Sequence, residues 1–368
     1  MTEIAEAGRR QSRVLRQDGQ GARAVESSIP TRMGDGALVF LKPAEIEAAI
    51  RDGVAAAVKR AKVEPLTEDE IAHLLDIFSS RSRFSAVDIG DEVTLSYDGC
   101  GSQDMGTRVN DLQYYEQYLC ADSVELYHQN YSFKPAKAVL GLEQTIMRHA
   151  QLLITAPCGY GAMPDLGLYT VPDGPLANWS QLLPLGKVAE ARAAQEEAVE
   201  LAVEDICHVA ASLAEAGADF IDLDTAGAAG DADFLAALKA IERIRARFPD
   251  LGIQIGMASE FVLGMHGELE YDGVRLAGLW PREQMKLAAK AGVTIFGPAI
   301  NVNTGKPVAW NVARTIAIVK QCCEEATVPV HLNGGMGVGG VPMHILPPGD
   351  AVSRASRAAV DILRLDGL

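Results

Sequence analysis

Two carboxylates and three amides follow short apolar runs, and these residues have the clearest capacity for chemistry: Asp224, Glu260, Asn301, Asn303 and Asn333. If the runs are parallel strands, their carboxyl ends meet at one edge of a sheet and the five side chains converge there. Carboxylates at such an edge can hold an ammonium group or transfer protons, and amides can orient a substrate. The alternative is local: Asp224 caps the following helix and the asparagines form turns.

Three other features carry weaker signals. Tyr160 follows another apolar run, where it could line the same edge or simply pack. The glycine-rich segment Gly334–Gly340 could cradle a phosphate, but it lacks the Gly-Lys-Ser/Thr ending of a P-loop, so a flexible lid is an equal alternative. His266 is outside any H-E-x-x-H arrangement, which favours a surface or capping histidine over a zinc ligand. We therefore expect no metal site and no nucleophilic triad.

Short apolar runs alternate with helical patterns from about residue 120 onward. The runs are Ser123–Tyr127, Leu152–Ala156, Phe220–Asp224, Ile253–Met257, Val293–Pro298 and Val328–Asn333. The helical patterns are Val188–Ala216, Asp233–Phe248, Pro281–Ala291 and Val308–Ala326. Strand, helix, strand at this spacing predicts parallel strands joined by right-handed crossovers.

The repetition of these units favours an α/β fold of the (β/α)8 TIM-type barrel over an open, doubly wound sheet. No Gly-x-Gly-x-x-Gly follows an early strand, which counts against a dinucleotide-binding fold. The pattern supplies about six strands, so we expect a barrel that is incomplete at the C-terminus, with an N-terminal α-rich extension.

The predicted domain organisation has three parts: a disordered N-terminal tail over residues 1–31, an α/β extension over residues 32–120, and a partial barrel catalytic domain over residues 121–368. In the extension, Pro43–Val58 and Thr67–Phe78 have amphipathic helical patterns, and Thr67 with Glu70 forms a capping box. Glu92–Tyr97 alternates like a strand.

Composition narrows the class of protein. With 48% hydrophobic and 22% charged residues the chain has the balance of a soluble globular protein. A net charge of −16 disfavours binding to nucleic acid or to anionic membranes. No apolar run reaches the ~18 residues of a membrane span, and residues 1–31 lack the apolar stretch expected of a secretion signal. The six cysteines form no C-x-x-C pair, which indicates reduced thiols in a cytoplasmic protein. Association into a homo-oligomer is left open.

The last residues resemble the beginning of a strand. The helical pattern Asp350–Leu363 runs into Arg364–Leu368, just as helices elsewhere run into Phe220–Asp224 and Val293–Pro298. This comparison predicts that Leu368 opens a strand beside a gap in the barrel wall, with an unpaired neighbouring edge. It also suggests an interrupted reading frame.

Eight stretches that follow one another along the chain resemble the dimethylamine:corrinoid methyltransferase family. They are Arg32–Gly36, Tyr131–Pro135, Tyr160–Pro164, Asp224–Asp231, Val262–Gly267, Tyr271–Val274, Leu276–Pro281 and Met336–Gly340. The order and number of these matches are far more specific than any single motif.

The resemblance implies a (β/α)8-type enzyme that moves a methyl group from dimethylamine to the Co(I) corrinoid of a cognate partner protein and releases monomethylamine. The chain itself would bind no cofactor. The family uses pyrrolysine, encoded by an in-frame amber codon, after an Asp-Gly-Ile-like triplet that here is Asp366-Gly367-Leu368. Pyrrolysine is thus expected after Leu368, and the 368-residue form is expected to be inactive. Asp224 and Glu260 would donate protons or hold the cation.

Two alternatives remain. The chain could be a pyrrolysine-free corrinoid methyltransferase for another methylated amine, with Leu368 as its natural end. It could also be a non-catalytic fragment that at most docks a corrinoid protein. The codon after that of Leu368 discriminates among the three hypotheses, because an amber codon followed by an open frame supports the pyrrolysine enzyme.

Overall fold

The structure is a computed structural model that describes residues 28–82, 85, 158–161, 166–218, 220–224, 226–227, 230–264, 268–333 and 348–367. Several sequence predictions lie outside these residues: the strands at Glu92–Tyr97, Ser123–Tyr127 and Leu152–Ala156, His266, and the glycine-rich segment Gly334–Gly340.

A parallel sheet of four strands forms the centre of the described structure. Its order is β3 (Cys158–Gly161), β4 (Phe220–Asp224), β5 (Gly252–Ala258) and β8 (Ile295–Pro298). Two parallel bridges extend it: Phe296 pairs with Val330, and His331 pairs with Gly367. The predicted strand at Val328–Asn333 is thus reduced to a short paired segment, in part because Pro329 has no N–H to donate.

Each segment of the sheet pairs with the next one along the chain, without a reversal of order. Sequential parallel order is what a (β/α) barrel requires, whereas a doubly wound sheet reverses its order at a switch point. The described residues form no closed barrel, however. The parallel α/β class is confirmed, and the TIM-type barrel remains a prediction.

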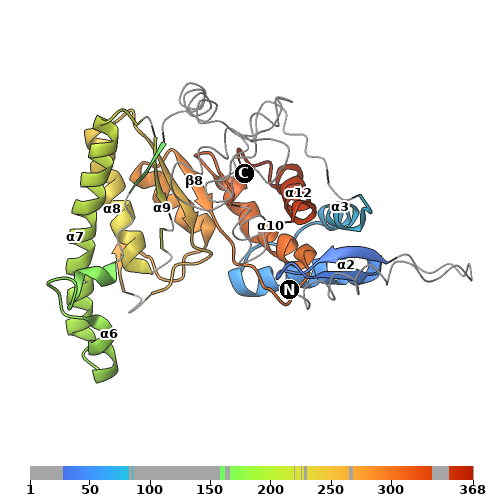
Figure 1. Ribbon diagram of the computed structural model, residues 1–368, viewed down its shortest axis with the longest axis horizontal. Coiled ribbons are helices and arrows are strands. Elements are labelled where there is room, and N and C mark those ends of the chain that lie inside the picture. Colours follow the sequence, from blue (N-terminus) through green and yellow to red (C-terminus); the bar gives the residue numbers. More distant parts are fainter. Residues whose placement is uncertain are drawn as a thin grey trace, which may run out of the picture.

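Helices connect the strands, as the sequence predicts. They are α7 (Val188–Glu215), α8 (Asp231–Arg247), α9 (Pro281–Ala291), α10 (Val308–Glu325) and α12 (Gly349–Ala358). Figure 1 shows α7 at one end of the molecule, followed by α8 and α9, with α10 and α12 on the other side of the sheet. The sequence explains where α9 begins and ends: Pro281 occupies its first turn, and Gly292 is its C-cap in a left-handed conformation with φ 111°.

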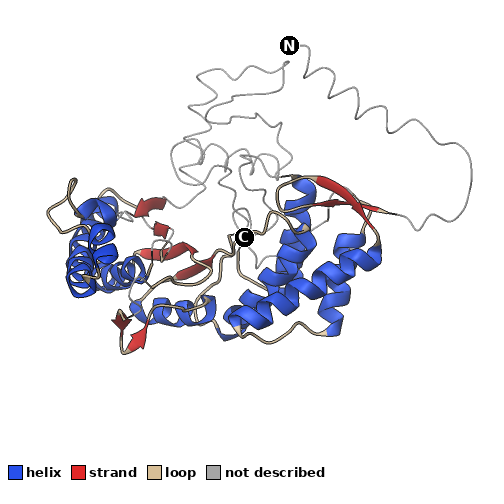
Figure 2. Cartoon of the chain, turned by 90° about the horizontal axis from the view of Figure 1, so that it is seen from below, coloured by secondary structure: helices blue, strands red, loops and turns tan. Residues whose placement is uncertain are grey.

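The N-terminal part consists of a hairpin and two helices. The hairpin pairs β1 (Ile29–Arg32) with β2 (Leu38–Leu41), and the helices are α2 (Pro43–Ala61) and α3 (Glu68–Ser79). The capping box predicted for Thr67 and Glu70 is present. β1 begins inside the segment that the sequence assigns to the tail, because Ile29 is buried against the core. The hairpin lies beside the N- and C-terminal helices (Figure 2).

Helix α2 packs closely on α10, so the extension and the α/β part share one core. The contact depends on Gly53 of α2: a Cβ at this position would lie 2.4 Å from the carbonyl oxygen of Trp310. Asp52 adds polar contacts, since it accepts hydrogen bonds from Lys306 Nζ and Trp310 Nε1, both at 2.8 Å.

The C-terminal residues leave the helix and reach the sheet through a single parallel bridge at Gly367, and the strand predicted to open at Leu368 lies outside the described residues. α12 continues as a π-helical turn (Ala359–Leu363), and Arg364 then takes a left-handed conformation with φ 49°. Gly367 N donates to Val330 O at 3.3 Å, and Leu332 N donates to Gly367 O at 3.1 Å. The pairing thus begins one residue before Leu368.

Smaller elements complete the described structure. They are the 3-10 turns η1 (Leu166–Tyr169) and η2 (Leu183–Leu185), the short helix α6 (Trp179–Leu182), and a hairpin of β6 (Glu270–Tyr271) and β7 (Val274–Arg275).

Candidate functional site

One face of the parallel sheet is apolar. Its side chains are fully or almost fully buried: Ile221, Leu223, Ile253, Ile255, Phe296, Val330 and Leu332. The register aligns these residues across the strands, because Ile221 pairs with Ile253, Leu223 with Ile255, and Ile255 with Phe296. Side chains at equal register share a face, so this row forms the core between sheet and helices.

The opposite face carries polar side chains together with the apolar Phe220 and Ile295, and we call it the polar face. Asp222 alternates with Ile221 and Leu223, and its register partner is Gln254. His331 alternates with Val330 and Leu332 in the same way. All three polar side chains are only partly exposed. Strands buried on both faces usually read as continuous apolar runs, so a carboxylate, an amide and an imidazole along one face are unusual for this kind of sheet.

Glycines make room for two of these polar side chains. A Cβ on Gly256 would lie 2.5 Å from Oδ1 and 2.7 Å from Oδ2 of Asp222. A Cβ on Gly367 would lie 1.9 Å from Cδ2 of His331. Real Cβ atoms do not approach so closely, so any other residue at either glycine would displace the carboxylate or the imidazole.

Burial lowers the pKa of His331 from its ordinary value. The cause is desolvation, which disfavours the charged imidazolium. His331 is therefore a neutral imidazole near pH 7, able to accept or share a proton.

The loops that follow the strands are tied together at the carboxyl edge of the sheet. Ser259 N donates to Ala226 O at 3.3 Å, Ala299 N to Ala258 O at 2.9 Å, and Asn333 N to Pro298 O at 3.1 Å. Glu260, Asn301, Asn303 and Asn333 therefore follow strands that end at the same edge.

Glu260 forms a buried ion pair with Arg314 of α10. The two side chains are 2% and 8% exposed, respectively. Arg314 Nη1 donates to Glu260 Oε2 at 3.1 Å, and Arg314 Nη2 donates to Oε1. Glu260 Oε2 also accepts from the backbone N–H of Asn301 at 3.0 Å. A carboxylate with these partners holds the loop after β8 in place.

The two asparagines in that loop have exposed side chains. Asn303 Oδ1 accepts from Gly305 N at 3.0 Å, which is the turn that the alternative interpretation predicts. The Asn303 backbone is held by Asn311, whose Oδ1 accepts from Asn303 N at 2.7 Å. Asn301 takes part through its backbone, since its carbonyl oxygen accepts from Arg314 Nη1 at 3.3 Å.

The remaining candidates are placed by their backbones. Tyr160 in β3 pairs with Asp222, and Asp224 at the end of β4 pairs with Gly256. Asn333 follows the paired segment and is partly exposed. Asp224 and Asn333 thus lie at the carboxyl ends of their segments, as expected from the sequence, whereas Tyr160 lies inside β3 and not after a strand. These positions do not assign the residues a role.

Asp222, Gln254 and His331 were missed because the sequence search looked only at residues after the strands. A signal was present: Ile221–Asp224 alternates apolar and acidic residues, and Gly252–Gly256 alternates isoleucine with small or polar residues. Period-two alternation inside a predicted parallel strand indicates one face that is not packed by helices.

The described cysteines are free thiols: Cys207, Cys322 and Cys323. Burial raises the pKa of each, to about 12 for Cys323, so they are protonated at neutral pH.

Within the described ranges, no group of three His, Cys, Asp or Glu side chains could hold a metal ion. No helix in this part of the chain is long and apolar enough to cross a bilayer.

The parallel sheet brings a carboxylate, an amide and an imidazole to one face, and such groups can bind a polar substrate. The chain belongs to the dimethylamine methyltransferase family (Dimeth_PyL), whose model matches residues 27–368. The match confirms the resemblance, and it identifies the enzyme as a dimethylamine methyltransferase. No solved structure matches this chain.

Proposed function

We propose that this enzyme transfers one methyl group of dimethylamine to the Co(I) ion of a corrinoid held by a partner protein. The C–N bond breaks, a Co–C bond forms with the electron pair of the reduced cobalt, and the nitrogen leaves as monomethylamine. If the substrate is dimethylammonium, its extra proton keeps the leaving amine neutral. The corrinoid is a co-substrate in this scheme. The residues of this chain bind and orient the amine.

The polar face of the sheet is the observation that carries this proposal. Dimethylamine is a cation at neutral pH, and the Asp222 carboxylate is the acidic group in the middle of that face. A carboxylate in a partly desolvated setting attracts a cation more strongly than it would in water. Gly256 leaves the space that the carboxylate occupies. Asp222 is therefore our candidate for the group that holds the ammonium.

Glu260 has a different role in this account. Its two oxygens already accept from Arg314 and from the Asn301 backbone. A proton on this carboxyl group would break a buried ion pair, which is costly. We therefore assign Glu260 to positioning the loop after β8, and we retain Asp224 as a second candidate for contact with the amine.

Pyrrolysine, which the resemblance implies after Leu368, fits the geometry of the polar face. Gly367 pairs with His331 in parallel register, and the position two residues on would lie opposite Asn333. Residues two apart along a strand share a face, so that position would lie on the same side as His331. An imine carbon supplied there could take up an amine. We also propose that the sheet closes into a barrel around this face.

The test is an assay with purified components: dimethylamine, a reduced corrinoid protein, and protein produced by readthrough after Leu368. Monomethylamine and methylated corrinoid should form in equal amounts, and trimethylamine should serve poorly as a methyl donor. The chain ending at Leu368 is the matched control and should show no transfer. Transfer by that control would support the pyrrolysine-free alternative, and no transfer by either form would contradict the proposal.

A further inference from the structure

The turn Arg32–Gly36, here called the N-terminal clamp, contacts two elements that lie more than 250 residues further along the chain. It begins with Arg32, the last residue of β1, and leads towards β2. It is also one of the stretches that carry the family resemblance, although it lies outside the sheet. Its contacts indicate what it does.

The first contact is with the loop after β8. Gly34 N donates to Lys306 O at 2.7 Å, and Met33 forms an antiparallel bridge with Pro307. The approach is so close that a Cβ on Gly34 would lie 2.2 Å from Asn303 O. Only glycine fits this position without moving the loop, and this is the loop that Glu260 and Arg314 hold from the other side.

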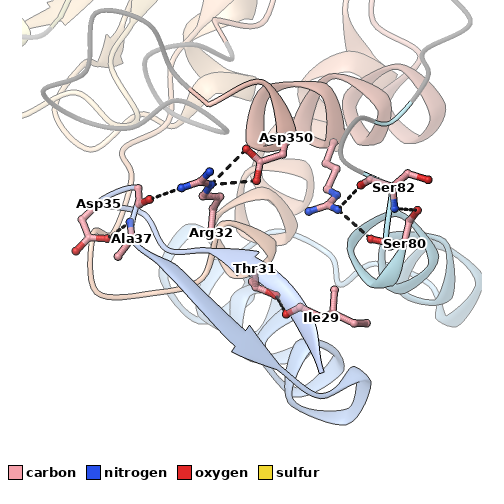
Figure 3. A network of polar contacts seen from close by, with 10 residues as sticks. Ile29, Thr31, Arg32, Asp35, Ala37, Ser80, Ser82 and Asp350 are labelled. Atoms are coloured by element: carbon pink, nitrogen blue, oxygen red, sulfur yellow. Dashed lines mark hydrogen bonds and ion pairs between the residues drawn. The ribbon is translucent and has the colours of Figure 1, made fainter. Parts of the chain in front are cut away.

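The second contact is with α12. Arg32 Nε donates to Asp350 Oδ2 at 3.0 Å, and Arg32 Nη1 donates to Gly36 O at 3.0 Å, as Figure 3 shows. The Arg32 and Asp350 side chains are 29% and 17% exposed, so the pair is partly screened from water. One guanidinium thus fixes both the turn and the first residues of α12.

The next turn of α12 is also anchored. Arg354 Nη2 donates to the carbonyl oxygens of Ser80 and Ser82, both at 2.9 Å (Figure 3). α12 leads through the π-helical turn to Gly367, which lies against His331. The position of α12 therefore sets where the chain enters the sheet beside the polar face.

We infer that the N-terminal clamp is a positioning segment for methyl transfer: it fixes the loop after β8 and α12 relative to one another. The expected effect on the rate rests on the proposed function. The expected effect on the positions of the loop and of α12 does not depend on it. The clamp touches no reacting atom. It acts through the loop and through α12, and it sets the alignment that an in-line transfer between two reactants needs.

The test compares Arg32→Met with Arg51→Met. Arg51 is a matched control, because it also pairs with carboxylates in the N-terminal part, through Glu68 and Glu47 on α3 and α2. In the chain ending at Leu368, amide exchange should rise about tenfold or more over residues 299–307 and 349–363 in Arg32→Met. The control should leave both segments unchanged. Gly34→Ala should raise exchange in the first segment.

In the readthrough protein, Arg32→Met should lower kcat about tenfold while KM for dimethylamine stays within about twofold, because alignment is lost and binding is kept. Arg32→Lys should restore part of kcat. Unchanged exchange in both segments would overturn the inference, as would raised exchange with an unchanged kcat. If the readthrough protein itself transfers no methyl group, the proposed function fails, and the exchange data still decide whether the clamp positions the two segments.

Discussion

The two faces of the parallel sheet are built from the same strands and do different work. Ile221 and Leu223 flank Asp222 in β4, and both apolar side chains are fully buried, while the carboxylate lies in a space kept by Gly256. The apolar face is packed by helices at close to crystal density, as protein cores are. The polar face is shaped by glycines that leave space. In our proposal the apolar face contributes mainly to stability and the polar face holds the substrate.

The comparison also separates two acidic residues that look alike in the sequence. Glu260 at the edge of the sheet is bound to Arg314, whereas Asp222 lies within the polar face. Removing the charge of Glu260 should therefore lower mainly the stability of the protein. Removing the charge of Asp222 should lower mainly its activity.

The largest effect on stability is expected for Glu260→Gln. The change keeps the shape and leaves the buried Arg314 charge without its counter-ion, which should cost roughly 3–5 kcal/mol of unfolding free energy. Urea unfolding measures this loss. The double variant Glu260→Gln with Arg314→Met should cost less than the sum of the single changes, because both remove the same interaction. Strict additivity would show that the pair does not act as a unit.

Leu223→Ala should cost roughly 2–5 kcal/mol, because it leaves a cavity on the apolar face. Leu223 is fully buried. The methyl-transfer rate per folded molecule should stay close to that of the parent protein, since no group on the polar face changes. Thermal or urea unfolding gives the first value, and an assay normalised to folded protein gives the second. A large loss of specific activity would mean that the two faces are not independent.

Gly256→Ala should have a smaller effect on stability, roughly 1–3 kcal/mol for overpacking. Its added methyl group would displace the Asp222 carboxylate, so activity should fall more than stability. Gly273→Ala is a useful control, because nothing lies within 4 Å of a Cβ there, although its φ of 73° adds backbone strain. Equal activity of Gly256→Ala and the parent protein would show that activity does not require the space beside Asp222.

The smallest effect concerns pH and His331. Its pKa is lowered by burial, so the native state stays neutral while the unfolded chain takes up a proton as the pH falls through the ordinary histidine range. The free energy of unfolding should therefore decrease as the pH falls from about 8 to about 5.5. In the His331→Gln variant this contribution to the pH dependence should be absent. Parallel pH profiles of the two proteins would show that His331 is not the group responsible.

The sequence predicted much of the fold and less of the site. Helices with clear signals at their ends were found closely, such as Pro281–Ala291 between an N-terminal proline and a C-terminal glycine. The N-terminal hairpin was missed, because β1 and β2 are four residues each and are stabilised by contacts with distant parts of the chain. Short strands have little periodicity to detect.

For the site, the sequence correctly brought the loops after the strands to one edge of the sheet. It could not show that Glu260 meets Arg314 across 54 residues, because ion-pair partners are set by packing. Nor could it show that Asp222 lies beside Gln254 and close to Gly256, since that depends on the register of the strands. Partner choice and register are properties of the assembled sheet.

The central claim is that the polar face holds the amine, and Asp222→Asn tests it most directly. This change removes the charge and keeps the shape of the side chain. In the readthrough protein, the rate of corrinoid methylation by dimethylamine should fall about 100-fold or more, as expected for loss of a charged group that acts in the transition state, while unfolding free energy changes by about 1 kcal/mol or less. Unchanged methylation by Asp222→Asn, measured beside Leu223→Ala, would contradict the account.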